Sequence, residues 1–338
     1  MTNLRRIFTL LVVGFTFYGK LYAQDPEFTQ FYANPLYLNP AFAGSAGGPR
    51  FCINFRDQWP SVSGNFVTYA ASYDEHFDGI GGGIGAQVMS DHAGDGNLTT
   101  NSVSGMYAYQ LTLKDNGNKD YFIVNMAIEA SAFQRSIDWS KLTFGDEIDS
   151  RLGFIYPTKE LLATQGVQTT AIIPDFSAGI LAYTSKFFAG IAVNHIIQPE
   201  QSFFNNPAST LPMKLTIHVG TEIAVDNWKR DPETFISPNI LFQRQAKFTQ
   251  VNFGAYLIKT YFMAGLWYRQ TAPNSDAIMA LIGVRKDAVQ IGYSYDLTVS
   301  QARTAATGSH EVSLIVQLQK YNHQKTRKWK AVPCPGFK

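Results

Sequence analysis

The stretch "VQIGYSYD" (Val289–Asp296) alternates apolar or aromatic residues with small or polar ones. Side chains of a β-strand point alternately to its two faces, so this period of two predicts a strand with one apolar face. The same alternation recurs in "VNMAIEASAF" (Val124–Phe133), "KLTIHVGTEI" (Lys214–Ile223) and "AIMALIGVR" (Ala277–Arg285). Helical periodicity is almost absent, and the pattern predicts an all-β fold.

Fourteen such segments are predicted, most of them about 9–11 residues long, which is the length that crosses a bilayer when a strand is tilted. Their spans are 50–58, 65–73, 81–90, 101–114, 120–135, 174–183, 186–195, 212–224, 235–243, 247–257, 260–270, 276–286, 288–296 and 309–318. Backbone groups in lipid must all be paired within the protein, so a spanning sheet has to close. The prediction is therefore a transmembrane outer-membrane β-barrel of antiparallel strands.

The lengths of the connections support this prediction. The long ones, 136–173, 196–211 and 297–308, all join strands at one end, whereas tight turns such as 184–185 and 286–287 lie at the other. Outer-membrane barrels have short periplasmic turns and longer external loops, and an even number of strands places both termini in the periplasm. The alternative, a soluble sandwich, would have long loops at both ends.

Charged residues are expected on the lumenal face, because a Lys or Arg facing lipid at the bilayer midplane costs about 2–4 kcal/mol. The residues placed there by their parity are Glu129, Lys214, His218, Glu222, Arg269 and Arg285. Aromatic residues near predicted strand ends are candidates for the interfacial girdles: Trp59, Tyr109, Tyr121, Trp267 and Tyr268.

Residues 1–23 have the pattern of a secretory signal peptide, with Arg5 and Arg6 before a short apolar run and Ala23 at the expected cleavage site. An uncleaved anchor helix is the alternative. Charged residues make up 16% of the chain, against about 25% in average soluble proteins. The net charge of +2 gives no indication of nucleic-acid binding.

The stretch "QDPEFTQFYANPLYLNPAFAG" (Gln24–Gly44) combines prolines, which break helices and strands, with many aromatic residues that should be buried. We expect residues 24–48 to start at the periplasmic mouth, before the barrel at 49–319, and to fold back as a compact plug. The residues expected to make this plug or to contact a partner are Phe28, Phe31, Tyr32, Asn34, Pro35, Asn39 and Pro40. A disordered tether to a periplasmic partner is the alternative.

The C-terminal tail, residues 320–338, is basic and follows the last predicted strand. It is expected to be periplasmic and to dock on an acidic partner, and the alternative is a solvated tail. The docking candidates are Lys325, Arg327, Lys328, Trp329 and Lys330. Cys52 points inward near the start of the first strand and Cys334 lies in this tail, so barrel closure could bring them together as a disulfide; two unrelated thiols are the alternative.

Catalytic, cofactor-binding and metal-binding residues are not predicted. The chain has no G-x-S-x-G, P-loop or dinucleotide-binding motif. A set formed by Ser177, Asn194 and His195 lacks such a signature, and the acidic turn at 91–97 does not match a calcium loop. We therefore expect a protein that is not an enzyme.

Several motifs in order along residues 24–338 resemble the PorP/SprF family of Bacteroidetes outer-membrane proteins. They are "PEFTQFYANPLYLNPAFAG", "INFRDQW" (Ile53–Trp59), "IPDFSAGILAY" (Ile173–Tyr183), "AGIAVNHI" (Ala189–Ile196), "SPNILFQRQ" (Ser237–Gln245), "GLWYR" (Gly265–Arg269), "HEVSL" (His310–Leu314) and "CPGF" (Cys334–Phe337). The resemblance implies a non-catalytic, cofactor-free component of the type IX secretion system. Its implied partners are the periplasmic ring, the translocon or a secreted surface adhesin of the gliding-motility type, together with outer-membrane lipid and no nucleic acid.

A passive or hydrophobic-substrate channel, similar to fatty-acid-transporter barrels, is the competing interpretation. The "NPA" motif also occurs in those barrels. The basic, cysteine-containing tail favours the secretion role, because a simple channel does not need it.

Overall fold

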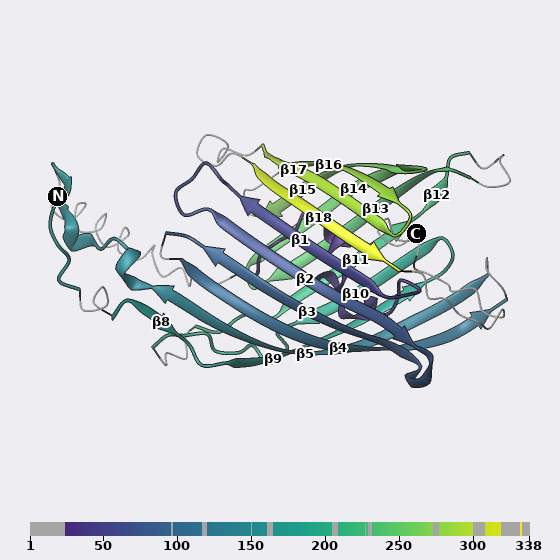
Figure 1. Ribbon diagram of the computed structural model, residues 1–338, viewed down its shortest axis with the longest axis horizontal. Helices are drawn as coiled ribbons and strands as arrows, with labels where there is room; N and C mark the ends of the chain where they lie inside the picture. Colours follow the sequence, from purple (N-terminus) through teal and green to yellow (C-terminus); the bar gives the residue numbers. More distant parts are fainter. Residues whose placement is uncertain are drawn as a thin grey trace, which may run out of the picture.

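The computed structural model describes residues 24–95, 97–116, 120–149, 151–160, 165–204, 209–226, 228, 232–272, 277–299, 308–318 and 332. Fourteen strands form a closed antiparallel barrel (Figure 1). They are β1 (Arg50–Gln58), β2 (Phe66–Phe77), β3 (Gly82–Ala93), β4 (Leu98–Asp115), β5 (Tyr121–Asp138), β9 (Ile173–Tyr183), β10 (Phe187–Asn194), β11 (Lys214–Thr221), β13 (Thr234–Gln245), β14 (Phe248–Lys259), β15 (Phe262–Ala272), β16 (Ala277–Lys286), β17 (Val289–Thr298) and β18 (Ser309–Gln317).

The remaining elements are short. Two strands extend the barrel sheet, β8 (Val167–Thr169) beside β5 and β12 (Ile223–Ala224) beside β13, and β6 (Ile148–Asp149) pairs with β7 (Gly153–Phe154). The helices are η1 (Phe31–Ala33), α2 (Pro35–Leu38), η2 (Pro40–Phe42), η3 (Asp78–Ile80), η4 (Trp139–Lys141) and η5 (Gly145–Glu147). Within the residues that the structure describes, no helix has the length and apolar character needed to span a membrane.

The barrel closes where β1 pairs with β18. Asn54 of β1 lies opposite Ala70 of β2 on one side and opposite Ser313 of β18 on the other. Closure leaves the first and last strands without free edges, so their backbone groups are paired as the membrane interior requires. The predicted all-β barrel of fourteen strands is confirmed.

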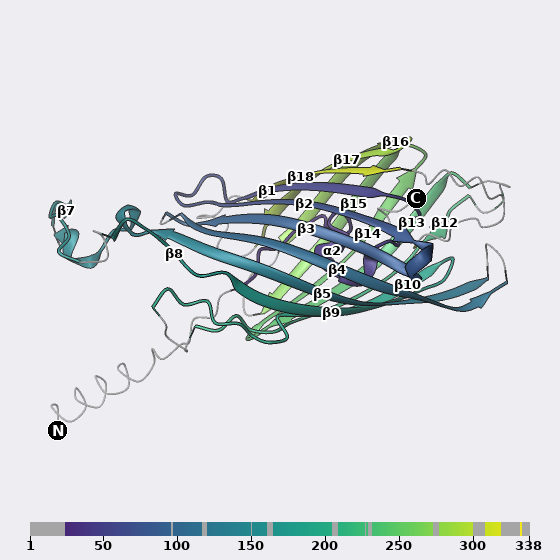
Figure 2. The same cartoon turned by 60° about the horizontal axis from the view of Figure 1, so that its bottom comes forward.

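The two ends of the barrel differ. At the end that we call the turn end, β9 is joined to β10 by residues 184–186 and β16 to β17 by residues 287–288. At the other end, the loop end, residues 139–172 and 195–213 make long connections, and the first of these projects far beyond the barrel (Figures 1 and 2). β1 begins and β18 ends at the turn end, as an even number of strands requires.

Side chains on the two faces of the barrel wall have opposite character. Ile128 of β5, Leu266 of β15 and Ile282 of β16 point outward and are 69%, 64% and 65% exposed. Lys214 and His218 of β11 point inward, with exposures of 6% and 0%. An apolar outer face suits lipid, and all six charged or histidine residues predicted to avoid it lie on the inner face or at its rim.

Two residues predicted for the aromatic girdles lie in the lumen instead, and a third, Trp59, lines a lumenal cavity just beyond the end of β1. Trp267 of β15 is 2% exposed, and its ring contacts Phe31, with 5.2 Å between centroids. Tyr121 is 6% exposed and contacts Tyr183. Parity decides the face, since the outward neighbour of Trp267 is Leu266. Tyr109, by contrast, is 45% exposed on the outer face.

Candidate functional site: the barrel lumen and the N-terminal segment

The N-terminal segment, residues 24–48, runs inside the barrel (Figure 2). Its Asn-Pro steps limit each helix to about one turn. Pro35 starts α2 and Pro40 starts η2, where the missing N–H of proline costs nothing, and the Asn39 side chain accepts a hydrogen bond of 2.9 Å from the backbone N of Ala41. The chain therefore turns repeatedly and packs as a compact body.

Aromatic residues anchor this body to the wall. Tyr32 makes an edge contact with Phe188 of β10 at 5.6 Å between centroids, and Phe42 stacks on His218 of β11 at 5.3 Å. Phe31, Tyr32 and Phe42 are 5%, 3% and 0% exposed. Burial at this level removes most of their apolar surface from water, which stabilises the folded state.

We expected the N-terminal segment to start at the periplasmic mouth, but the structure places its start at the loop end. Asp25 accepts from His195 Nε2 at 2.9 Å and lies 3.5 Å from Lys214 Nζ. His195 follows β10 and Lys214 begins β11, both at the loop end. The segment then runs down the lumen to Arg50, where β1 begins at the turn end.

A buried ion pair holds the turn end of this segment. Arg50 binds Asp74 of β2 through two hydrogen bonds of 2.7 and 2.9 Å, and both side chains are 0% exposed. Both partners also bind the segment: Arg50 Nη2 donates to the carbonyl of Phe42 at 3.1 Å, and the backbone N of Gly44 donates to Asp74 at 2.8 Å. Bidentate pairing and these extra bonds offset part of the desolvation cost.

A second charged group, the arginine–carboxylate cluster, binds residues 29 and 30. Glu311 accepts from the backbone N of Thr29 at 2.6 Å and from that of Gln30 at 3.1 Å. Arg56 lies 3.2 Å from Glu311 and 3.0 Å from Asp296, and it donates to the Thr29 hydroxyl at 2.6 Å. Arg269 also donates to Asp296, at 3.2 Å, so two arginines balance two carboxylates.

Asn39 lies against the opposite wall. Its amide nitrogen donates to the carbonyl of Ile180 at 3.1 Å and lies 3.2 Å from His218 Nε2. The approach is close because the facing residues of β9 and β10 are Gly179 and Gly190. Glycine in a strand often marks the place where another backbone or a ligand approaches.

The electrostatics at the loop end follow from the contacts of Asp25. Burial alone would raise the pKa of Asp25, but His195 and Lys214 hold it far below its usual range. Burial alone would lower the pKa of His195, yet Asp25 and Asp175 raise it to about 9. His195 is thus positively charged at neutral pH and bridges the segment to β9.

The predicted segment residues Phe28, Phe31, Tyr32, Asn34, Pro35, Asn39 and Pro40 all lie in the lumen and are buried. Sequence reasoning missed Arg50, Asp74, Arg56, Asp296 and Glu311 as their partners. Each is a charged residue whose place in the strand alternation puts it on the inward face, and this pattern could have identified it from the sequence. Cys52 is 1% exposed in the lumen, whereas Cys334 lies outside the described residues, so the disulfide stays a prediction.

The tail candidates Lys325, Arg327, Lys328, Trp329 and Lys330 also lie outside the described residues. Val332 of the tail is described, and it is 0% exposed in the same apolar cluster as Phe42. Ser177, Asn194 and His195, considered above as a catalytic set, do not have the hydrogen bonds that such a set needs. Both ring nitrogens of His195 face carboxylates, and the Ser177 hydroxyl accepts from Asn194 at 3.3 Å. The described part of the chain contains no group of three or more His, Cys, Asp or Glu placed to hold a metal ion.

A closed barrel with an apolar outer face and a polar lumen defines an outer-membrane β-barrel protein. The sequence matches the type IX secretion system membrane proteins PorP/SprF over residues 20–316, and the chain belongs to that family. No curated protein matches it.

Solved barrels resemble the structure at low identity. The CymD monoaromatic hydrocarbon channel has a TM-score of 0.48 and 12% identity, covering 86% of this chain and 94% of its own. The outer-membrane protein Omp33 of Acinetobacter baumannii has 0.43 and 9%, covering 81% and 100%. A FadL homologue of Pseudomonas aeruginosa has 0.43 and 10%, covering 82% and 93%. None of these TM-scores reaches 0.5.

Proposed function

We propose that the chain is a non-catalytic outer-membrane component of type IX secretion whose barrel is closed by its own N-terminal segment. In this role it links the periplasmic machinery to the outer membrane, or it anchors or exports a secreted surface adhesin. One observation supports the proposal above the others: Thr29, Phe42 and Gly44 are bound to charged groups of the wall that are themselves buried. With the lumen occupied in this way, an exported polypeptide would cross the membrane through a partner and not through this barrel.

A closed barrel acts through its exposed ends. The connection at residues 139–172, which we call the loop-end excursion, exposes three large apolar side chains. Leu152, Phe154 and Tyr156 are 72%, 64% and 53% exposed. Exposed aromatic residues on a loop held by a rigid scaffold are typical of binding surfaces. The turn end would contact periplasmic partners, together with the basic tail.

The test is purification of the tagged chain from native outer membranes in mild detergent, followed by mass spectrometry of the proteins that accompany it. We expect the periplasmic secretion ring, the translocon or a surface adhesin. A matched variant with Lys325, Arg327, Lys328 and Lys330 changed to Gln keeps the barrel and is expected to lose the periplasmic partners. A chain that remains alone after crosslinking, and conducts in planar bilayers, would instead be a channel.

A further inference from the structure

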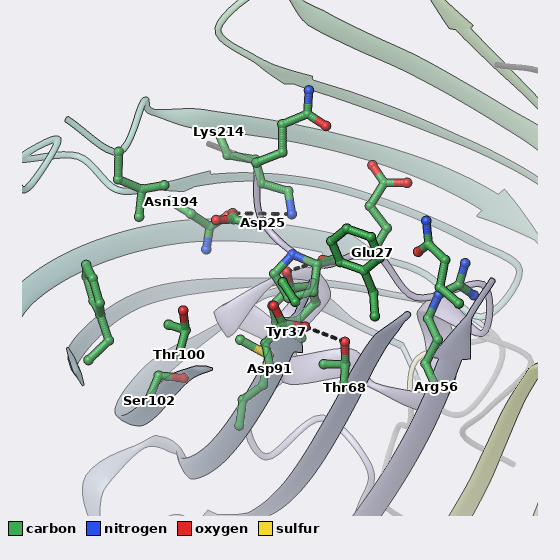
Figure 3. A pocket seen from close by; sticks show the side chains of 18 of the residues that line it. Asp25, Glu27, Tyr37, Arg56, Thr68, Asp91, Thr100, Ser102, Asn194 and Lys214 are labelled. Carbon is green, nitrogen blue, oxygen red and sulfur yellow. Dashed lines mark hydrogen bonds and ion pairs between the residues drawn. The ribbon is translucent and has the colours of Figure 1, made fainter. Parts of the chain in front are cut away.

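A cavity of about 570 Å³ lies in the loop-end half of the lumen, above the N-terminal segment. Asp25, Glu27 and Tyr37 of the segment form part of its lining, and inward side chains of the strands form most of the rest, together with residues of the loop-end connections such as His195 and Gln201 (Figure 3). Pockets that bind small molecules have volumes of about 300–1,000 Å³. The cavity is therefore large enough for a small ligand.

The positively charged side chains around the cavity already have partners. Lys214 lies 3.5 Å from Asp25, and Arg56 and Arg269 lie 3.0 and 3.2 Å from Asp296. Arg135 donates to the carbonyl of Gln201 at 3.1 Å and lies over the ring of Phe203. His195 is held between two carboxylates. Each of these cations thus has at least one partner, while Arg56 Nε and Arg269 Nη2 have no hydrogen-bond partner among the described residues.

Three carboxylates that line the cavity have no such partner. They are Glu27 of the segment, Asp91 of β3 and Glu129 of β5, and none has a Lys, Arg or His nitrogen within 4.0 Å among the described residues. Asp91 accepts from the hydroxyl of Thr68 at 2.6 Å, a neutral donor (Figure 3). Six carboxylates and five basic side chains line the cavity, so negative charge exceeds positive charge by one when all of them are ionised.

Buried acceptor atoms on the cavity wall point to the same ligand chemistry. Asp175 and Gln250 are 2% and 1% exposed, and Asp175 Oδ1 and Gln250 Oε1 have no hydrogen-bond partner among the described residues. Both residues line the cavity. A buried acceptor left without a donor costs about 1–3 kcal/mol, so a ligand that brings N–H donors is favoured there.

Tyr37 lies among these carboxylates. Burial, together with Asp25, Asp91, Glu27 and Glu129, raises the pKa of its phenol well above the usual value. The negative charges therefore act on one small region. The cavity lining also includes apolar surface from Trp59, Phe66 and Phe133, which suits a hydrophobic ligand body and cation–π contacts.

We propose that this cavity binds a small ligand that carries an ammonium or guanidinium group on an apolar body. Glu27, Asp91 and Glu129 bind the cation, and the aromatic residues enclose the apolar part. The site goes beyond the secretion role and does not depend on it, because it is built from lumenal residues and not from the exposed ends of the barrel.

The experiment is a calorimetric titration of the intact, detergent-purified chain with phenethylamine, and with phenethyl alcohol as the neutral analogue. We expect saturable binding of the amine and at least about 10-fold weaker binding of the alcohol, since hydrogen bonds to charged groups are the strong ones. The variants Glu129→Gln and Glu27→Gln should each weaken amine binding about 10-fold. The control Glu160→Gln, on the exposed loop-end excursion, should leave it unchanged.

Two outcomes would overturn the proposal. Equal binding of amine and alcohol would mean an apolar cavity without cation recognition, and no saturable binding to the wild-type chain would mean that the cavity is not a site. Glu27 lies on the N-terminal segment and not on a strand, so its variant tests the proposal even where Glu129→Gln impairs barrel folding. Copurification of secretion partners is a separate measurement, and its outcome does not decide this one.

Discussion

At the scale of single residues, the fit of the N-terminal segment depends on side chains that are absent from the wall. A Cβ atom at Gly179 would lie 2.1 Å from Asn39 Oδ1, and one at Gly190 would lie 2.8 Å from Asn39 Nδ2. A Cβ at Gly83 would lie 2.3 Å from the carbonyl of Ala43. These inward glycines make room for the segment at several heights of the barrel.

The Gly179→Ala substitution is therefore expected to displace Asn39 and loosen the segment. Overpacking of this kind typically costs about 1–3 kcal/mol. Gly105→Ala is the matched control, because a Cβ on that strand glycine would meet nothing within 4 Å. Protease cleavage within residues 24–48, followed by mass spectrometry, is the measurement. Equal protection of the two variants would contradict the role assigned to Gly179.

The Arg50–Asp74 pair is predicted to be the most sensitive charged contact in the lumen. Arg50→Met leaves Asp74 buried without a cation, a change that costs about 3–5 kcal/mol. The double variant Arg50→Met, Asp74→Asn should recover part of that loss. Urea unfolding in detergent micelles measures the difference.

The exposed pair Lys114–Asp120 provides the control, with side chains 52% and 54% exposed. Asp120→Asn should leave the urea midpoint unchanged, because exposed pairs contribute little. A similar shift for Arg50→Met and Asp120→Asn would show that burial does not matter here.

The His195 contact predicts a dependence on pH. Its pKa is raised to about 9 in the folded chain, against about 6.5 in an unfolded one. The contacts of protonated His195 contribute their full stabilisation at a pH below the pKa of the unfolded chain. This contribution is lost as the pH rises through about 9, the pKa in the folded chain. As the pH is raised from 7 to 10, the urea midpoint of the wild-type chain should decrease by more than that of His195→Gln. Parallel pH profiles of the two proteins would rule out this contribution.

Which lumenal residues meet could not be predicted from the sequence, although the face that each occupies could. Parity placed Lys214, His218 and Glu222 inward, because alternation is a local property. Arg56 binds Asp296 and Glu311 across 240 and 255 residues of sequence. That pairing is set by barrel closure and by the path of the segment between them, which no local pattern contains.

At the scale of elements, the N-terminal segment fills part of the lumen with buried side chains. Removal of residues 24–44 eliminates the rings of Phe31, Tyr32 and Phe42 from the core and leaves Arg56 and Glu311 without the Thr29 contacts. We expect a chain that still inserts but unfolds at lower urea concentration and conducts ions in planar bilayers. A deletion protein as stable as the parent, with no new conductance, would contradict the proposed closure.

Strand prediction succeeded where alternation was regular and failed at the ends of strands. β1 has the predicted bounds of 50–58, whereas β4 and β5 each extend to 18 residues. The predicted strand 212–224 is divided into β11 and β12 at Glu222. Extensions beyond the membrane depend on pairing with distant neighbours, such as β5 with β8, and not on hydrophobicity.

At the scale of the whole molecule, the apolar outer face predicts how the barrel responds to a charge. Ile128 lies near the middle of β5 and is 69% exposed, while Ile148 lies on the loop-end excursion and is 51% exposed. Ile128→Lys is expected to cost about 2–4 kcal/mol, because the ammonium would face lipid near the midplane. Ile148→Lys should cost little, since it would face water.

Urea unfolding from lipid vesicles, rather than from micelles, measures this difference because a detergent micelle adapts its thickness more readily than a bilayer. A soluble protein with this sheet would show similar small losses for both variants, because a lysine at either exposed position would be hydrated. The ratio between the two losses therefore tests the membrane assignment of the outer face directly, without reference to any partner of the secretion system.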